Sequence, residues 1–98
     1  MHQLKSIQAL QHKVQAQGTR RSNKSKSAYT RALLLLAQYS ESPERETLKE
    51  AIQYLEISLQ AARNYLPPYI ALGTLYYGLQ RPNEALKYLK AAQILEPE

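Results

Sequence analysis

The sequence predicts an all-α protein, and three observations support this class. A six-residue stretch recurs after 34 residues, since Glu50–Leu55 and Glu84–Leu89 are identical at four of six positions. Apolar residues recur at spacings of three and four, which places them on one side of a helix. Prolines stand between the periodic segments, where they end one helix or start the next. We therefore expect one leading helix followed by two helical hairpins.

The composition bounds the size and class of the protein. Its 98 residues make one domain. It has no cysteine, which excludes disulfides and thiolate chemistry. The longest apolar run, Ala32–Ala37, is far too short to span a bilayer, and Met1–Lys13 lacks the apolar core of a signal peptide. The default expectation is a cytoplasmic protein without a membrane span.

The net charge of +5 is unevenly distributed along the chain. Met1–Arg31 has seven Lys or Arg and no Asp or Glu, which gives +7. Ala32–Glu98 has six Lys or Arg against eight Glu, which gives −2. The amino-terminal third is therefore strongly basic, and the remainder is mildly acidic.

Residues 1–17 are predicted to form a leading amphipathic helix. Leu4, Ile7 and Val14 follow helical spacing, and Gly18 is a natural stop just after the last turn. A surface helix with one narrow apolar stripe usually docks on its own domain. The alternatives are pairing with another chain and disorder in isolation.

Residues 18–26 are predicted to be a basic linker between the leading helix and the next one. The stretch lacks apolar residues, which favours a solvated loop. Such a loop can contact phosphates or an acidic protein surface, or it can serve only to keep the chain soluble. Its basic patch consists of Arg20, Arg21, Lys24 and Lys26.

Residues 27–65 are predicted to form the first helical hairpin. Ser27–Ser40 is apolar over much of its surface, as expected for a helix that is packed on more than one side. The second helix begins either at Ser42-Pro43 or at Thr47, where a capping-box pattern is present. It ends before Pro67-Pro68, because proline cannot continue the helix.

Residues 66–98 are predicted to form the second hairpin and carry the clearest motif. Gly73 and Ala85 are small enough to let two antiparallel helices approach closely, and a glycine inside a helix costs about 1 kcal/mol relative to alanine. An aromatic residue, Leu-Gly, Tyr, Ala, a bulky residue and Pro follow at fixed offsets: Tyr69, Leu72, Gly73, Tyr76, Ala85, Leu89 and Pro97. Through these residues the stretch closely resembles a tetratricopeptide repeat (TPR).

The resemblance implies about two TPR-like helix-turn-helix units, forming a fragment of a right-handed solenoid behind the leading helix. The first unit departs from the family pattern and lacks the closing proline. Leu33, Leu36 and Ala37 occupy its aromatic, leucine and small positions if its turn is about two residues longer. In the second unit, Gln80 stands where the family often has glycine.

Members of this family usually bind other proteins, so the resemblance implies an adaptor or scaffold for a partner protein or peptide, within a larger assembly. Ile70 and Thr74 do not supply the Lys/Asn clamp of chaperone-tail-binding members, which favours an extended or helical apolar-anchored peptide. Apolar residues left uncovered at the open end of the repeats allow self-association, or indicate an excerpt of a longer chain. The groove residues carried over from the family positions are Arg31, Leu34, Gln38, Ile70, Thr74 and Tyr77.

The sequence offers no catalytic, metal-binding or cofactor-binding constellation, so an enzyme is not expected. His2 and His12 have no acidic neighbours, and no glycine-rich phosphate loop occurs. The alternative function is a nucleic-acid-associated helical-repeat protein that uses segment 18–26 on phosphates. Four tyrosines are expected in the core rather than in a base-stacking platform, namely Tyr54, Tyr69, Tyr76 and Tyr88.

Overall fold

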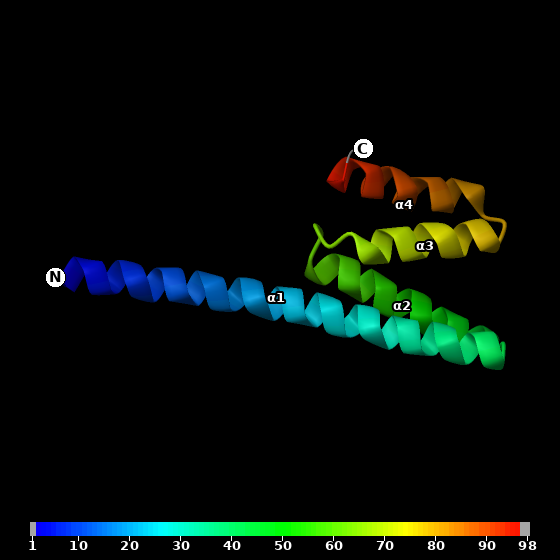
Figure 1. Ribbon diagram of the computed structural model, residues 1–98, viewed down its shortest axis with the longest axis horizontal. Coiled ribbons are helices and arrows are strands. Elements are labelled where there is room, and N and C mark those ends of the chain that lie inside the picture. The colour runs from blue at the N-terminus through cyan, green and yellow to red at the C-terminus, as the bar shows by residue number, and fades with distance from the viewer. Residues whose placement is uncertain (1, 97–98) are drawn as a thin grey trace.

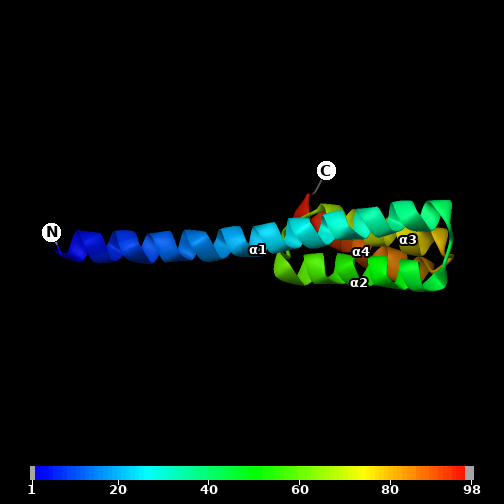
Figure 2. The same cartoon turned by 90° about the horizontal axis from the view of Figure 1, so that it is seen from below.

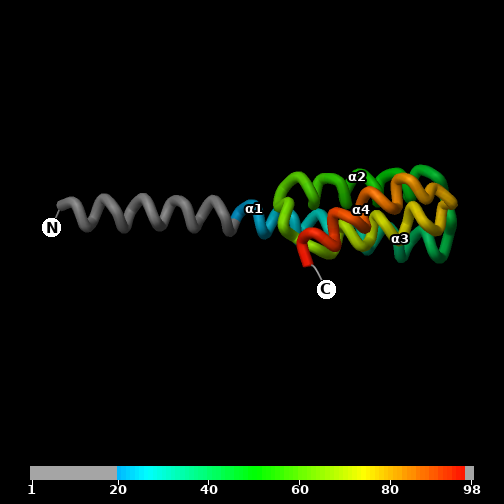
Figure 3. The backbone as a smooth tube through the Cα atoms, turned by 90° about the horizontal axis from the view of Figure 1, so that it is seen from above, coloured from blue at the N-terminus to red at the C-terminus, as the bar shows by residue number. Residues whose placement is uncertain are grey.

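Four α-helices follow one another in the computed structural model, which describes the backbone of residues 2–96 and the side chains of residues 20–96. Each helix runs antiparallel to the one before it, so the chain forms two hairpins (Figure 1, Figure 2). The turns within the hairpins lie at the same end of the molecule (Figure 1, Figure 3). No strand occurs in residues 2–96, and the predicted all-α class is confirmed. The helices are α1 (His2–Glu41), α2 (Arg45–Ala61), α3 (Pro67–Gly78) and α4 (Pro82–Leu95).

The basic segment 18–26 is helical, so the predicted loop is wrong and the five expected helices are four. α1 runs through this segment without interruption. Serine, asparagine, lysine and arginine are all tolerated in a helix, and Gly18 costs only about 1 kcal/mol relative to alanine. Ser25 and Ala28 are buried, at 0% and 7% exposure. Packing of these small residues outweighs a local composition that favours a loop.

Two serines fix the register of α1 against α2. Oγ of Ser25 donates to the backbone oxygen of Ser58 over 2.8 Å, and Oγ of Ser58 donates to the backbone oxygen of Ser25 over 2.7 Å. The two Oγ atoms lie 3.0 Å apart, and both residues are fully buried. The pair therefore avoids the free-energy cost of unsatisfied buried hydroxyls. Ala32 and Ala51, also fully buried, are the small side chains one heptad further along each helix.

The buried stripe of α1 differs from the one predicted from the sequence. Leu33 is 44% exposed and Ala37 is exposed, whereas Ala32 and Leu35 are buried. A shift of one residue turns a helix face by about 100°. The leucine run Leu33–Leu36 contains no polar residue that would mark its solvent side. The spacing of apolar residues therefore predicted the wrong buried face. The assignment of Leu33 and Ala37 to core positions is wrong.

Gly73 lies at the contact between α3 and α4. It is buried, and a Cβ added there would lie 2.6 Å from Cγ and Cδ2 of Leu89 and 3.5 Å from the backbone oxygen of Ala85. Ala85 is 2% exposed and Leu72 is fully buried. The second hairpin is thus built around a glycine that leaves room for the Leu89 side chain.

A single hydrophobic core joins the two hairpins. Its fully or largely buried members come from three helices, since Ala32 lies on α1, Leu55 and Leu59 on α2, and Leu72 on α3. Leu55 and Leu59 place α2 between the other two helices. Partly buried tyrosines pack around this core, namely Tyr29, Tyr54, Tyr69, Tyr76 and Tyr88.

The end of α3 adopts a left-handed turn at Gln80. Its φ is 62°, and its backbone N–H donates to the oxygen of Tyr77 over 3.0 Å. The next N–H, of Arg81, reaches back to the oxygen of Tyr76 over 2.9 Å. These two bonds form a Schellman motif, in which glycine is preferred at the left-handed position. Pro82 then starts α4.

Replacing Gly73 by alanine should lower the free energy of unfolding by roughly 1 kcal/mol. Overpacking against Leu89 costs about 1–3 kcal/mol, which exceeds a helix-propensity gain of about 1 kcal/mol. In a Leu89→Ala background the same change should stabilise the protein, because the obstructing side chain is gone. Urea denaturation followed by circular dichroism measures both effects. Equal effects in the two backgrounds would contradict the packing role of Gly73.

Replacing Gln80 by glycine should raise the free energy of unfolding by about 1 kcal/mol. A residue with a Cβ is strained in the left-handed region by about 1–2 kcal/mol, and glycine's greater freedom in the unfolded chain offsets part of the gain. The matched control is Gln93→Gly, which places glycine within helix α4 and should destabilise the protein by about 1 kcal/mol. Thermal denaturation of both variants gives the two signs.

Candidate functional site

An apolar groove of about 540 Å³ lies between the first helices of the two hairpins. On α3, its lining residues recur at spacings of three and four, which defines one helix face. α1 contributes two residues and α2 one. Only Thr74 and the hydroxyl of Tyr39 bring polar side-chain atoms to the lining. The complete lining is Leu36, Tyr39, Leu48, Ala71, Thr74, Leu75, Gly78 and Leu79.

The groove stays open because α1 and α3 are each anchored to the core by a different face. Leu72, on the opposite side of α3 from Thr74, is fully buried, so α3 is anchored by that side. On α1, Ala32 and Leu35 face inward and leave Leu36 partly exposed. The two anchored faces leave a strip of apolar side chains between α1 and α3 without a covering helix among the described residues.

Of the six predicted groove residues, the structure places one in this groove. Thr74 lines it, whereas Ile70, 45% exposed, lines a separate depression with Leu89. Tyr77 is 74% exposed and lies beside Gln80. The predicted members therefore do not converge on one cavity.

The three predicted groove residues of α1 also lie elsewhere. The guanidinium carbon of Arg31 lies 6.0 Å from the centre of the Tyr54 ring, a cation–π contact with α2. Leu34 is 60% exposed and Gln38 is exposed. The prediction missed Leu36 and Tyr39 because it assumed a rotated face for α1. A heptad count back from Tyr39 through Ala32 to Ser25 was the available signal.

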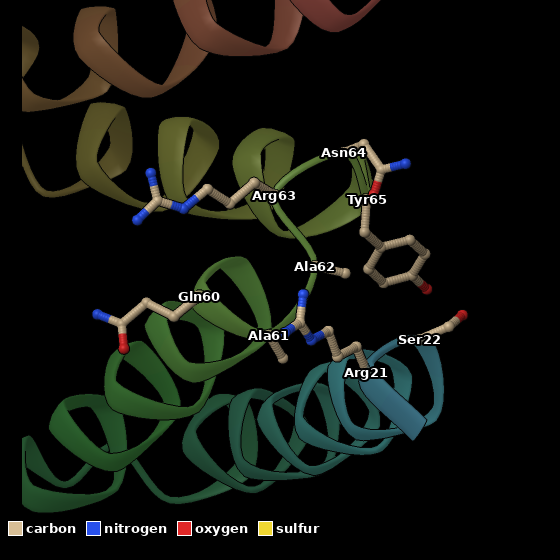
Figure 4. A pocket seen from close by; sticks show the side chains of 8 residues that line it. All are labelled: Arg21, Ser22, Gln60, Ala61, Ala62, Arg63, Asn64 and Tyr65. Atoms are coloured by element: carbon tan, nitrogen blue, oxygen red, sulfur yellow. The ribbon is translucent and has the colours of Figure 1, made fainter. Parts of the chain in front are cut away.

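A polar pocket of about 630 Å³ lies at the other end of the first hairpin. Figure 4 shows Arg21 reaching from α1 toward the end of α2, and Arg63 extending from the α2–α3 connection. A cation near Ala61 and Ala62 suits the carbonyl end of α2, where the helix dipole is negative. The lining residues are Arg21, Ser22, Gln60, Ala61, Ala62, Arg63, Asn64 and Tyr65, and none is acidic.

The predicted basic patch is fully accessible but does not act as one cluster. Arg20, Arg21, Lys24 and Lys26 are all exposed. Of the four, Arg21 lines the polar pocket. Helical geometry puts Lys24 and Lys26 on opposite sides of α1, because residues two apart do not face each other.

Two of the tyrosines expected in the core form a ring stack within the second hairpin, between α3 and α4. The rings of Tyr76 and Tyr88 are stacked, with centres 5.8 Å apart and planes 5° from parallel. The Tyr88 hydroxyl donates a hydrogen bond to the Glu56 carboxylate, which ties α4 to α2. The Tyr69 hydroxyl donates to the backbone oxygen of Arg63 over 2.7 Å. Pro97, the last predicted repeat residue, lies outside the described residues.

Both stacked phenols are harder to ionise than a free tyrosine. Burial, the hydrogen bond to Glu56 and the charge of Glu56 raise the pKa of Tyr88 well above its usual value. Burial, and then the charges of Glu84 and Glu56, raise the pKa of Tyr76 despite the nearby Arg81. Both phenols therefore stay protonated further into the alkaline range than a free tyrosine, which suits a structural contact rather than a nucleophile.

Two further properties concern metals and membranes. Residues 20–96 hold no group of three His, Cys, Asp or Glu side chains arranged to bind a metal ion. None of the helices described combines the length and apolar character needed to cross a membrane.

A scan of protein-family models found no match to the chain, and neither curated proteins nor solved structures gave one.

The Tyr88–Glu56 bond should make stability fall at alkaline pH. The folded pKa of Tyr88 is raised, so its contribution is complete below the unfolded value of about 10 and is lost as pH rises through the folded value. Tyr88→Phe should lower the free energy of unfolding at pH 8 by about 1 kcal/mol and flatten its decline above pH 10. Urea denaturation across this range measures both quantities. Tyr77→Phe, which keeps the bond, is the matched control, and identical slopes in both variants would contradict the assignment.

Proposed function

We propose that this chain is a TPR-like helical-repeat module that binds a helical segment of a partner protein in the groove between α1 and α3. The groove's apolar lining is the observation that carries the proposal. An apolar strip on a protein of this size gains free energy when another apolar surface covers it, at about 25 cal/mol per Å² removed from water.

Equivalent positions in the two hairpins support the repeat interpretation. Ala51 and Ala85 stand 34 residues apart and are 0% and 2% exposed. Tyr54 and Tyr88 keep the same offset, and both are partly buried. These two positions agree in burial, as expected of stacked helical pairs, whereas Leu55 is fully buried and its counterpart Leu89 is 41% exposed.

The polarity of the groove favours a helical partner over an extended one. An extended peptide presents backbone N–H and C=O groups that need hydrogen-bond partners. The lining supplies only Thr74 and the Tyr39 hydroxyl for that purpose. A helix satisfies its own backbone and presents apolar side chains at spacings of three, four and seven. The partner is therefore an amphipathic helix with apolar anchors.

A binding module of this kind serves as an adaptor or scaffold within an assembly, and the proposal contains no catalytic step. The partner's apolar side chains fill the groove, whose walls are Leu36, Leu48 and Leu75. Affinity then depends mainly on apolar contacts and only modestly on salt.

A charge placed in the groove should weaken partner binding at least tenfold. Thr74→Glu, on α3, sets a carboxylate against the apolar lining, and the control Thr30→Glu makes the same change at an exposed position of α1 outside that lining. Peptides selected from a random library on the unaltered chain should bind Thr74→Glu at least tenfold more weakly, since a charge buried without a partner costs several kcal/mol. Fluorescence anisotropy of the labelled peptides gives each Kd.

The control and the sequences of the peptides make the outcome decisive. Thr30→Glu should bind the selected peptides within about twofold of the unaltered chain, since exposed substitutions have small effects. The peptides should carry apolar residues at helical spacing. Peptides that bind Thr74→Glu as tightly as the unaltered chain would rule out the groove as their site.

A further inference from the structure

The part of α1 between Arg20 and Arg31 presents cations on one face. Arg20, Lys24 and Arg31 are four and seven residues apart, which places them within about 40° of one another around the helix. All three are exposed. They span about 16 Å along the axis, at 1.5 Å per residue. This alignment exists only because segment 18–26 is helical.

The serine pair brings a further cation to the same end of the hairpin. The Ser25–Ser58 bonds align the antiparallel helices, so residues 20–24 lie beside residues 59–63. That part of α2 and its connection contains Arg63 and no acid. Arg21 and Arg63 line a common pocket (Figure 4). We call Arg20, Arg21, Lys24 and Arg63, together with Arg31 about 16 Å further along α1, the basic end.

Among residues 20–96, no member of the basic end forms an ion pair within 4.0 Å. The first acidic residue of the chain is Glu41. Within residues 20–96, the one ion pair shorter than 4.0 Å joins Arg81 and Glu84. Glu56 shares a pocket with Arg63, but its carboxylate accepts a hydrogen bond from Tyr88. The five cations outnumber this carboxylate, and exposed like charges four apart on a helix, as Arg20 and Lys24 are, cost a few tenths of a kcal/mol per pair. Their arrangement suits an external polyanion.

We propose that the basic end binds the phosphate backbone of duplex nucleic acid without reading its sequence. Each strand of a duplex offers a phosphate about every 3.4 Å of axis, so a 16 Å face meets about five of them. Asn23, Ser27 and Thr30 are exposed on the same stretch and add hydrogen-bond donors of the kind that contact phosphates.

Other polyanions fit the surface less well. Between Arg20 and Arg31 no apolar side chain is exposed, so nothing there inserts into a bilayer. Tyr29 is packed against the core and the ring of Tyr65, at a centre distance of 5.8 Å, which leaves no stacking platform for single-stranded bases. An acidic protein surface lacks the regular charge spacing of a duplex.

The basic end and the apolar groove occupy different sides of α1. The groove uses Leu36 and Tyr39, toward α3, whereas Arg31 lies against Tyr54 of α2. Nucleic-acid binding can therefore be tested independently of the proposed binding of a partner helix.

The test measures binding of the full chain to a fluorescein-labelled duplex of about 20 base pairs by fluorescence anisotropy. Five phosphate contacts predict that log K falls against log salt with a slope of about −4.5. Between about 50 mM and 200 mM NaCl, affinity should therefore fall about 500-fold. A slope shallower than about −2 would contradict five contacts.

Two lysines give a matched pair of variants that change net charge equally. Lys24→Gln removes a member of the basic end, whereas Lys26→Gln removes a cation about 200° away around the helix. Lys24→Gln should weaken binding about tenfold at low salt and reduce the slope by about 0.9, and Lys26→Gln should weaken it less than twofold. Circular dichroism checks that both variants keep their helix content.

Three outcomes would overturn the proposal. Equal losses from Lys24→Gln and Lys26→Gln would mean that diffuse charge, and not this face, attracts the duplex. Equal competition by poly-glutamate of matched charge would mean that any polyanion suffices. Absence of binding at low salt would show that the cations serve only to keep the protein soluble.

Discussion

The reciprocal hydrogen bonds between Ser25 and Ser58 are the constraint on which the rest of the structure depends. They hold α1 and α2 in one register and leave no buried hydroxyl unsatisfied. That register sets Ala32 and Ala51 at the close contact of the same hairpin, where larger side chains would force the helices apart. Small residues bury little apolar area, so this contact gains little hydrophobic free energy. The directional hydrogen bonds of the two serines therefore determine the helix register, because large interlocking side chains are absent there. With the register fixed, Leu55 and Leu59 are positioned to receive α3.

The width of the apolar groove follows from how the second hairpin rests on α2. α1 packs on α2 through the contact around Ser25 and Ala32, and α3 packs on α2 through Leu72. The groove is the space that remains between α1 and α3. The hydrogen bond from Tyr88 to Glu56 provides a second attachment, at α4. Two attachments restrain rotation better than one, so this bond contributes to groove shape as well as to stability. The partner helix that we propose would therefore meet walls whose spacing is set before it binds.

Local chemistry predicted some features of this molecule and missed others for identifiable reasons. Pro67 and Gly73 carry their structural meaning in their own covalent geometry, so the second hairpin was predictable. The helical state of segment 18–26 depends on Ser25 meeting Ser58, 33 residues away, and no local pattern reports that contact. The groove was misplaced because the leucine run has no polar residue to mark its outer face. The sequence thus predicts structure well where a residue restricts its own backbone. It predicts structure poorly where a contact with a residue far along the chain determines the local conformation.

Continuity of α1 through its basic segment changes the meaning of the charges it carries. If segment 18–26 were a loop, Arg20 and Lys24 would sample many positions relative to Arg31, and ordering them on a phosphate backbone would cost conformational entropy at each contact. In the helix their spacing is set by folding, so that cost is met before any ligand binds. The hairpin register adds Arg63 to the same end and keeps Glu41 at the other, which gives the hairpin a charge gradient along its axis. A gradient of this kind orients an approaching polyanion toward the basic end and away from the groove, so one rigid helix separates the two proposed surfaces.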